Sequence, residues 1–178
     1  MIEFAADLET PVSAFIKLSP LQPVFLLESA ERNETVGRYS FLGILPREYF
    51  VLTDLQKASP FFSSLASVLS RLKAGDGGRL GTGLVGFLSY DSVGMFHPHL
   101  KVKPSGVPLS AFVLPSAILT FDHLKRKMLF TSILDEDEQN DLLAQIRKCL
   151  ASPIALPPPG KASEPVSPIQ KADFFEMV

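Results

Sequence analysis

The stretch "SAILTFDHLKRKMLFTSIL", Ser116 to Leu134, decides the fold class of this chain. Two apolar segments rich in β-branched and aromatic residues, "SAILTFD" and "KMLFTSIL", flank the polar connection "HLKRK". A connection this short joins two strands as an antiparallel hairpin, because parallel strands need a crossover of a dozen or more residues. The stretch therefore predicts antiparallel pairing.

Further elements are predicted upstream and downstream of the hairpin. Segments bounded by Gly, Pro, Asp or Ser predict the strands "PVFLLES", "GRYSFLGIL", "EYFVLT" and "GLVGFLSYD". Helical spacing of apolar residues predicts a helix over about 60–74, with Ser59 as its N-cap. Asp135 followed by Glu138 is a variant of the capping box and predicts a second helix over about 136–150. These elements predict an α+β fold, mainly an antiparallel sheet with helices packed on it.

The composition argues against nucleic-acid and membrane partners. The 178 residues are 46% hydrophobic and 20% charged, and 17 basic against 19 acidic residues leave no basic footprint for a phosphate backbone. The N-terminal "MIEFAADLET" carries acids where a secretory signal carries Lys or Arg, and no apolar run approaches the roughly 20 residues of a membrane span. A cytoplasmic location is expected. The one cysteine, Cys149, fits a reducing compartment and is expected to pack on a helix face.

The chain changes character after its predicted second helix. Residues 151–170 hold six of the fifteen prolines, which predicts an irregular linker or surface crossing. The last segment, "KADFFEMV" over 171–178, begins like a helix and carries no stop signal. We therefore expect an α+β domain over 1–150, a proline-rich crossing over 151–170, and the start of a second domain over 171–178 of a longer protein.

Two motifs that resemble ligand sites have simpler structural interpretations. Gly81 to Gly86 matches G-x-G-x-x-G, but a dinucleotide fingerprint follows a strand and opens a helix, whereas this motif follows a helix and enters a strand. A glycine-rich turn with close backbone packing is favoured. His97 and His99 could share a metal ion, but further ligands are not near in the sequence, so solvated loop histidines are favoured.

The remaining candidate is the pair Glu28 and Ser29, a carboxylate and a hydroxyl at the end of an apolar strand. Such a pair can be a solvated cap of the following turn. It can also belong to a small-ligand site, in which Leu26 and Leu27 form an apolar wall and the polar groups bind the charged end of an amino acid. The spacing alone leaves both interpretations open.

Four segments in order resemble the N-terminal part of the anthranilate synthase component I family, of the chorismate-utilising enzymes: "FLLESA", "GRYSFLG", "GLVGFLSYD" and "LTFDH". The resemblance extends from about Val24 to Val178 and implies the N-terminal part of a larger layered α/β sandwich. Two segments depart from the family pattern. "DSVGMFHPH" has Gly94 where the family usually has a larger, often basic residue, and "SGVPLSAF" lacks the acids common before that strand.

The resemblance implies a lyase that converts chorismate and ammonia to anthranilate and pyruvate in tryptophan biosynthesis. It also implies Mg²⁺ as cofactor and a glutamine amidotransferase subunit, component II, as partner. The catalytic and metal-binding residues of the family lie downstream of Val178, so the fragment alone is expected to be inactive and to contain no catalytic residue. Residue by residue, the L-tryptophan feedback site would include Leu27, Glu28 and Ser29, with Ser40 as a further member.

Two alternatives remain. Aminodeoxychorismate synthase component I, of folate synthesis, is similar over the same region, but its corresponding segment more often resembles Leu-Asp-Ser, so Glu28 favours the tryptophan pathway. The second alternative is a non-catalytic module that binds an amino acid, whose reading frame would end soon after Val178.

Overall fold

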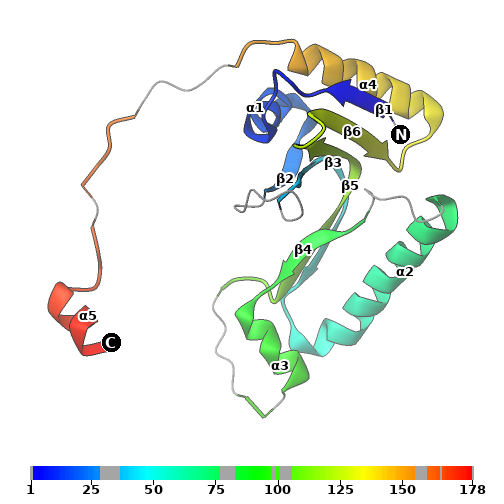
Figure 1. The fold of residues 1–178 in the computed structure, drawn as a ribbon. Coiled ribbons are helices and arrows are strands. Elements are labelled where there is room, and N and C mark those ends of the chain that lie inside the picture. Colours follow the sequence, from blue (N-terminus) through cyan, green and yellow to red (C-terminus); the bar gives the residue numbers. More distant parts are fainter. Residues whose placement is uncertain are drawn as a thin grey trace.

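The computed structural model describes residues 2–28, 37–76, 83–97, 99–100, 106–154, 160–164 and 166–177. One antiparallel sheet forms its centre, with the strand order β1-β6-β5-β3-β2 and with β4 paired to β5 (Figure 1). The strands of the described residues are β1 Ile2–Ala5, β2 Pro23–Leu27, β3 Tyr39–Leu52, β4 Val85–Leu88, β5 Ser110–Asp122 and β6 Lys127–Ser132. The helices are α1 Pro11–Lys17, α2 Ala58–Asp76, α3 Val93–Phe96, α4 Glu136–Leu150 and α5 Lys171–Met177. The predicted α+β fold is confirmed.

The predicted hairpin is the β5–β6 pair, and its antiparallel pairing is confirmed. The paired residues extend to Asp122 opposite Lys127, and Arg126 closes the turn with a left-handed φ of 51°. The carboxylate of Asp122 accepts the backbone N–H groups of Leu124 and Lys125, each at 3.1 Å. The turn is therefore held by a side chain of the strand that enters it.

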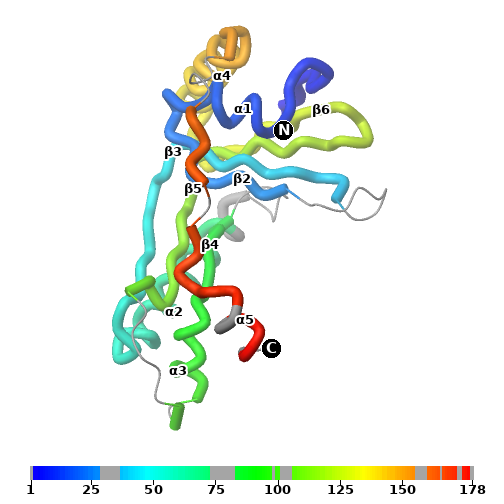
Figure 2. The backbone as a smooth tube through the Cα atoms, turned by 90° about the vertical axis from the view of Figure 1, so that its left-hand side faces the viewer, coloured from blue at the N-terminus to red at the C-terminus, as the bar shows by residue number. Residues whose placement is uncertain are grey.

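β3 is one strand where the sequence predicted two, so that prediction is wrong. It pairs with β5 on both sides of a register shift between Pro46 and Glu48, next to Leu45, whose φ is 52°. Pro46 lies opposite Pro115, and neither proline can donate an N–H to the ladder, so a bulge absorbs both prolines without ending the strand. Figure 2 shows the two long strands turning in this region, which divides the sheet into two halves.

The two halves carry their helices on opposite faces. The first half consists of β1, β6, β2 and the parts of β3 and β5 around Leu42 and Ala117. In this half, α1 and α4 pack on the face that contains Leu42 and Ala117. In the second half, Phe61 of α2 contacts Phe112 of β5, with the ring centroids 6.5 Å apart. Phe112 and Ala117 are separated by an odd number of positions in one strand, and such residues point to opposite faces.

The main core lies between the first half of the sheet and the helices α1 and α4. Each large apolar side chain removed from water there contributes roughly 1.5–3 kcal/mol to folding. Cys149 packs against this core, as predicted. The core consists of Ala14, Leu18, Leu21, Leu42, Ile44, Ala117, Leu119, Phe121, Met128, Phe130, Leu142, Leu143 and Ile146.

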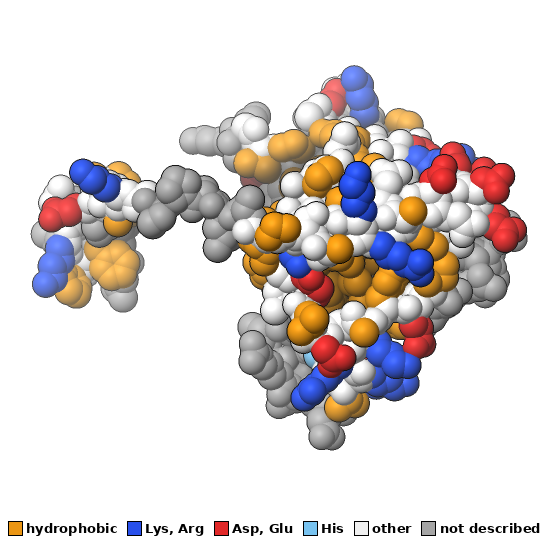
Figure 3. All heavy atoms as spheres, turned by 90° about the horizontal axis from the view of Figure 1, so that it is seen from above, with side chains coloured by type: hydrophobic (Ala, Val, Ile, Leu, Met, Phe, Trp, Pro, Cys, Tyr) orange, Lys and Arg blue, Asp and Glu red, His pale blue; other side chains and the backbone are white. Residues whose placement is uncertain are grey.

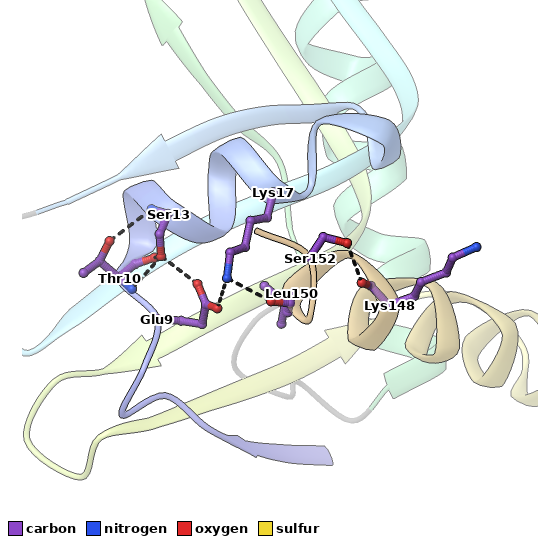
Figure 4. Close-up of polar contacts among 7 residues, drawn as sticks. All are labelled: Glu9, Thr10, Ser13, Lys17, Lys148, Leu150 and Ser152. Atoms are coloured by element: carbon purple, nitrogen blue, oxygen red, sulfur yellow. Dashed lines mark hydrogen bonds and ion pairs between the residues drawn. The ribbon is translucent and has the colours of Figure 1, made fainter. Parts of the chain in front are cut away.

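Helix α4 is fixed at both ends. Asp135 is the predicted N-cap and accepts the N–H of Glu138 at 2.9 Å. At the other end, the ammonium of Lys17 donates to the carbonyl of Leu150 at 2.9 Å and to the carboxylate of Glu9 (Figure 4). The side chains of Lys17 and Glu9 are only 13% and 12% exposed, and the cation lies at the negative end of the α4 dipole.

Helix α2 begins earlier than predicted, and the assignment of Ser59 as its N-cap is wrong. A 3₁₀ turn, Leu55–Lys57, leads directly into α2. Asp54 caps this turn by accepting the N–H of Gln56 at 2.9 Å. Because the chain is already helical at Ala58, Ser59 lies in the first turn of the helix.

The segment after α4 contains no helix or strand over 151–154, 160–164 and 166–170, which agrees with the irregular crossing predicted there. Beyond it, α5 stands apart from the sheet (Figure 1), with Phe174 and Phe175 more than half exposed. In the view from above, apolar side chains lie on this separate helix, while acidic side chains gather at the end of the main body that is farthest from it (Figure 3). Among the described residues, no helix has the length and apolar character to cross a membrane.

Candidate functional site

The predicted site residues that the structure describes lie at one end of the first half of the sheet. Antiparallel pairing places the end of β2 beside the start of β3, where Leu27 lies opposite Phe41. The end of β5 also meets the start of β3, where Asp122 lies opposite Tyr39. This end of the sheet therefore gathers residues from three separate segments of the sequence.

Leu26 and Leu27 point to opposite faces of β2. Leu26 lies opposite Leu42 and packs against the core, whereas Leu27 is 46% exposed on the other face, beside Phe41. Glu28 follows directly and is exposed. The two-leucine wall suggested by the sequence is therefore wrong for Leu26, and the apolar surface is formed by Leu27 and Phe41. Ser29 lies outside the described residues.

Ser40 lies on the core face of β3, the face of Leu42, and not on the face of Leu27. It is 2% exposed, and its Oγ is 2.7 Å from Nε2 of His123. His123 itself is exposed. Sequence reasoning missed this histidine, although it ends the segment "LTFDH", because only the tertiary structure shows which strand pairs with Ser40.

Arg38 and Asp122 form a second polar pair between the same two segments. The guanidinium donates twice to the carboxylate, Nε to Oδ1 at 3.0 Å and Nη2 to Oδ2 at 2.7 Å. Asp122 is 5% exposed. The hydrogen bonds from Arg38 lower the pKa of Asp122 to about 2, against the opposing effect of burial. The carboxylate is therefore ionised and fully engaged at neutral pH.

A serine bonded to a histidine also occurs in nucleophilic catalysis, but this pair does not fit that role. A nucleophile must be reachable by its substrate, and Ser40 is almost completely buried. A nucleophilic pair also needs a third group that orients the imidazole, and no described residue forms a hydrogen bond with Nδ1 of His123. The groups exposed at this end of the sheet are the carboxylate of Glu28, the imidazole of His123, whose Nε2 lies beside Ser40 of the core face, and the apolar surface of Leu27 and Phe41 on the opposite face.

The other motifs have structural explanations. His97 and His99 are exposed, with ring centroids 5.6 Å apart, and no group of three or more potential metal ligands occurs among the described residues. Gly81 lies outside the described residues. Gly86 is in β4, where an added Cβ would come 2.0 Å from the carbonyl oxygen of Ala111. Close backbone packing is therefore confirmed for Gly86.

Comparison with known proteins identifies a consistent set of relatives, although no family model matches the chain. The chain is 37% identical over 135 residues to anthranilate synthase component 1 of Thermus thermophilus, which covers 68% of this chain and 29% of that protein. It is 33% identical over 162 residues to the protein of that name from Synechocystis, covering 78% of this chain and 31% of the relative. For the Neisseria meningitidis serogroup B protein the identity is 25% over 205 residues, which covers 97% of this chain and 41% of that protein. The chain spans about a third of the length of these curated relatives.

Proposed function

Because the chain is homologous to part of anthranilate synthase component 1, we propose that it is the N-terminal part of such a polypeptide. The complete polypeptide would be a lyase that converts chorismate and ammonia to anthranilate and pyruvate in tryptophan biosynthesis. The similarity to the Thermus protein, which extends over two thirds of this chain, carries the proposal. Cytoplasmic location, and ammonia supply by a glutamine amidotransferase partner, are part of the same proposal.

The chemistry would reside mainly outside the described residues. A lyase acting on a dianion needs cationic or metal groups around its substrate carboxylates. The described residues contain no group of three or more potential metal ligands, and the guanidinium of Arg38 is already paired with Asp122. We therefore assign the Mg²⁺ ligands and the catalytic residues to the remainder of the polypeptide.

This chain would contribute part of the site through which L-tryptophan inhibits the enzyme, formed by Leu27, Glu28 and Ser29, with Ser40 nearby. The exposed side chain of Leu27 beside Phe41 offers an apolar surface to an indole ring. The exposed carboxylate of Glu28 can accept hydrogen bonds from the ammonium group of an amino acid. The exposure of Leu27 and Glu28 supports the proposed site, in which the apolar contact would supply most of the affinity and the polar groups would select an amino acid.

The proposal is tested by incubating the complete polypeptide with chorismate, Mg²⁺ and an ammonium salt and recording anthranilate fluorescence. We expect anthranilate from the complete polypeptide and none from residues 1–178 alone. Added tryptophan should inhibit, and Glu28→Ala or Ser29→Ala should raise the half-inhibiting concentration about tenfold or more, since a charged or buried polar contact contributes roughly 1–3 kcal/mol. Formation of aminodeoxychorismate in place of anthranilate would contradict the assigned reaction. Unaltered inhibition of both variants would identify Glu28 and Ser29 as a solvated turn cap.

A further inference from the structure

The second half of the sheet carries α2 on one of its two faces. This half consists of β4 and of the parts of β3 and β5 that lie beyond the register shift. Val51 of β3 and Phe87 of β4 both lie opposite Ala111 of β5, so the three side chains point to the same face. The neighbouring Phe112 contacts Phe61 of α2, and adjacent residues of a strand point to opposite faces. The row through Ala111 therefore lies on the face away from α2.

A second row of side chains runs beside the first. Tyr49 of β3 and Val85 of β4 both lie opposite Val113 of β5, two positions along each strand from the first row. Side chains two positions apart in a strand share a face, so both rows point away from α2. We call this surface the open face, and it consists of Tyr49, Val51, Val85, Phe87, Ala111 and Val113.

The open face is apolar and accessible to solvent. Tyr49, Val51 and Phe87 are 65%, 55% and 46% exposed, and the other three residues of the face are partly buried. An antiparallel sheet with one face in water places apolar residues on the covered face and polar residues on the other. Two neighbouring rows of apolar residues on the exposed face break this rule. A contiguous exposed apolar patch of this kind is typical of an interaction surface.

The polypeptide that follows residue 178 is the occupant that the observations favour. The chain covers between 29% and 41% of the three relatives compared above, so more than half of a polypeptide of that length lies outside it. Figure 1 shows α5, the last described helix, on the opposite side of the sheet from α2, which is the side of the open face. None of the six side chains of the open face is charged at neutral pH, so apolar side chains are the matching partners.

We propose that the open face is a docking surface for the part of the complete polypeptide that follows residue 178, which covers it with apolar side chains. This inference rests on the proposed function only in requiring that the chain is the N-terminal part of a longer polypeptide. The surface is distinct from the proposed effector site, because Leu27 and Phe41 lie in the first half of the sheet. Residues 1–178 alone expose an apolar face that the complete polypeptide buries.

The inference is tested by labelling a cysteine placed on the open face with a maleimide and following the peptide that contains it by mass spectrometry. In residues 1–178, Val51→Cys should be labelled as readily as Ser67→Cys, a control at an exposed position of α2. In the complete polypeptide, labelling of Val51→Cys should slow by about tenfold or more, because a covered thiol reacts only when the interface opens. Phe87→Cys, on a different strand of the same face, should be protected in the same way. Labelling of Ser67→Cys should be unchanged.

The outcomes separate this inference from the proposed function. Equal labelling of Val51→Cys in residues 1–178 and in the complete polypeptide would overturn the inference. Protection that develops in residues 1–178 as their concentration rises would overturn it as well, since the occupant would then be a second copy of the chain. If the complete polypeptide forms anthranilate while Val51→Cys stays reactive, the docking surface is refuted and the proposed function stands. If Val51→Cys is protected and no anthranilate forms, the docking surface stands and the proposed lyase activity is refuted.

Discussion

Replacing Asp122 by Asn should reveal how much the Arg38–Asp122 pair stabilises the fold. Asn has the shape of Asp, and its Oδ1 can still accept hydrogen bonds from the N–H groups of Leu124 and Lys125. Asp122→Asn removes the charge and replaces Oδ2, the acceptor for Arg38 Nη2, by an NH₂ group that cannot accept a hydrogen bond. The pKa of Asp122 falls from 3.8 to about 2 in the folded protein, and at ~1.4 kcal/mol for each pKa unit this corresponds to roughly 2 kcal/mol. The variant should lose about this free energy of unfolding at pH 7.

The pH dependence distinguishes charge from packing. Because the folded-state pKa lies below the unfolded value, the contribution is fully present well above pH 3.8 and is lost as the pH falls through about 2. The difference between wild type and Asp122→Asn should therefore fall to roughly half by pH 3 and decrease further below it. The free energies of unfolding of the wild type and of Asp122→Asn are measured by urea unfolding with circular dichroism at several pH values.

The control for this experiment is Glu3→Gln. Glu3 pairs with Lys127 at 2.6 Å, but both side chains are about half exposed, so solvent screens the pair and the urea midpoint should change little. A destabilisation by Asp122→Asn that is equal at pH 7 and pH 3 would refute the electrostatic reasoning and assign the effect to packing. An unchanged midpoint at pH 7 would show that the ion pair contributes nothing net to folding.

Two further predictions concern the scaffold, and a third concerns ligand binding. Lys17→Met should lower the free energy of unfolding by roughly 1–3 kcal/mol, because the nearly buried carboxylate of Glu9 loses its cation. It should also speed amide exchange in the last turn of α4. The control Arg71→Met, in the exposed pair with Glu48, should have little effect on either measurement. Gly86→Ala should lower the thermal midpoint, since the new methyl would meet the backbone of β5, whereas Gly160→Ala, with open space around it, should not. Residues 1–178 should bind tryptophan weakly or not at all when titrated by the ligand's own fluorescence, because the chain contains no Trp and the opposite wall of the site is proposed to lie in the remainder of the polypeptide. Tight binding by this chain would contradict that division of the site.

Elements whose contacts are local could be predicted from the sequence. The β5–β6 hairpin follows from two apolar runs and one polar turn, and α4 follows from Asp135 and its bond to the N–H of Glu138, a contact within one helical turn. The start of α2 was misplaced because the 3₁₀ turn at Leu55–Lys57 competes with the serine cap, and local propensity does not decide between them.

The bulge in β3 could not be predicted from the residues of β3 alone. Considered without its partner strand, the segment around Pro46 predicts the end of a strand, because proline lacks the N–H that a ladder requires. Only the register with β5 shows that Pro46 faces Pro115, so that one irregularity accommodates both prolines and the strand continues.

The candidate site shows the same division between sequence and structure. The end of the apolar strand at Leu27 and Glu28 could be predicted from the sequence, because that boundary is local. Three other features needed the pairing of distant strands: Leu26 packs against the core, Ser40 is buried, and its partner is His123, more than 80 positions away. A strand's own sequence gives the alternation of its side chains, whereas the neighbouring strands and helices determine which face is covered.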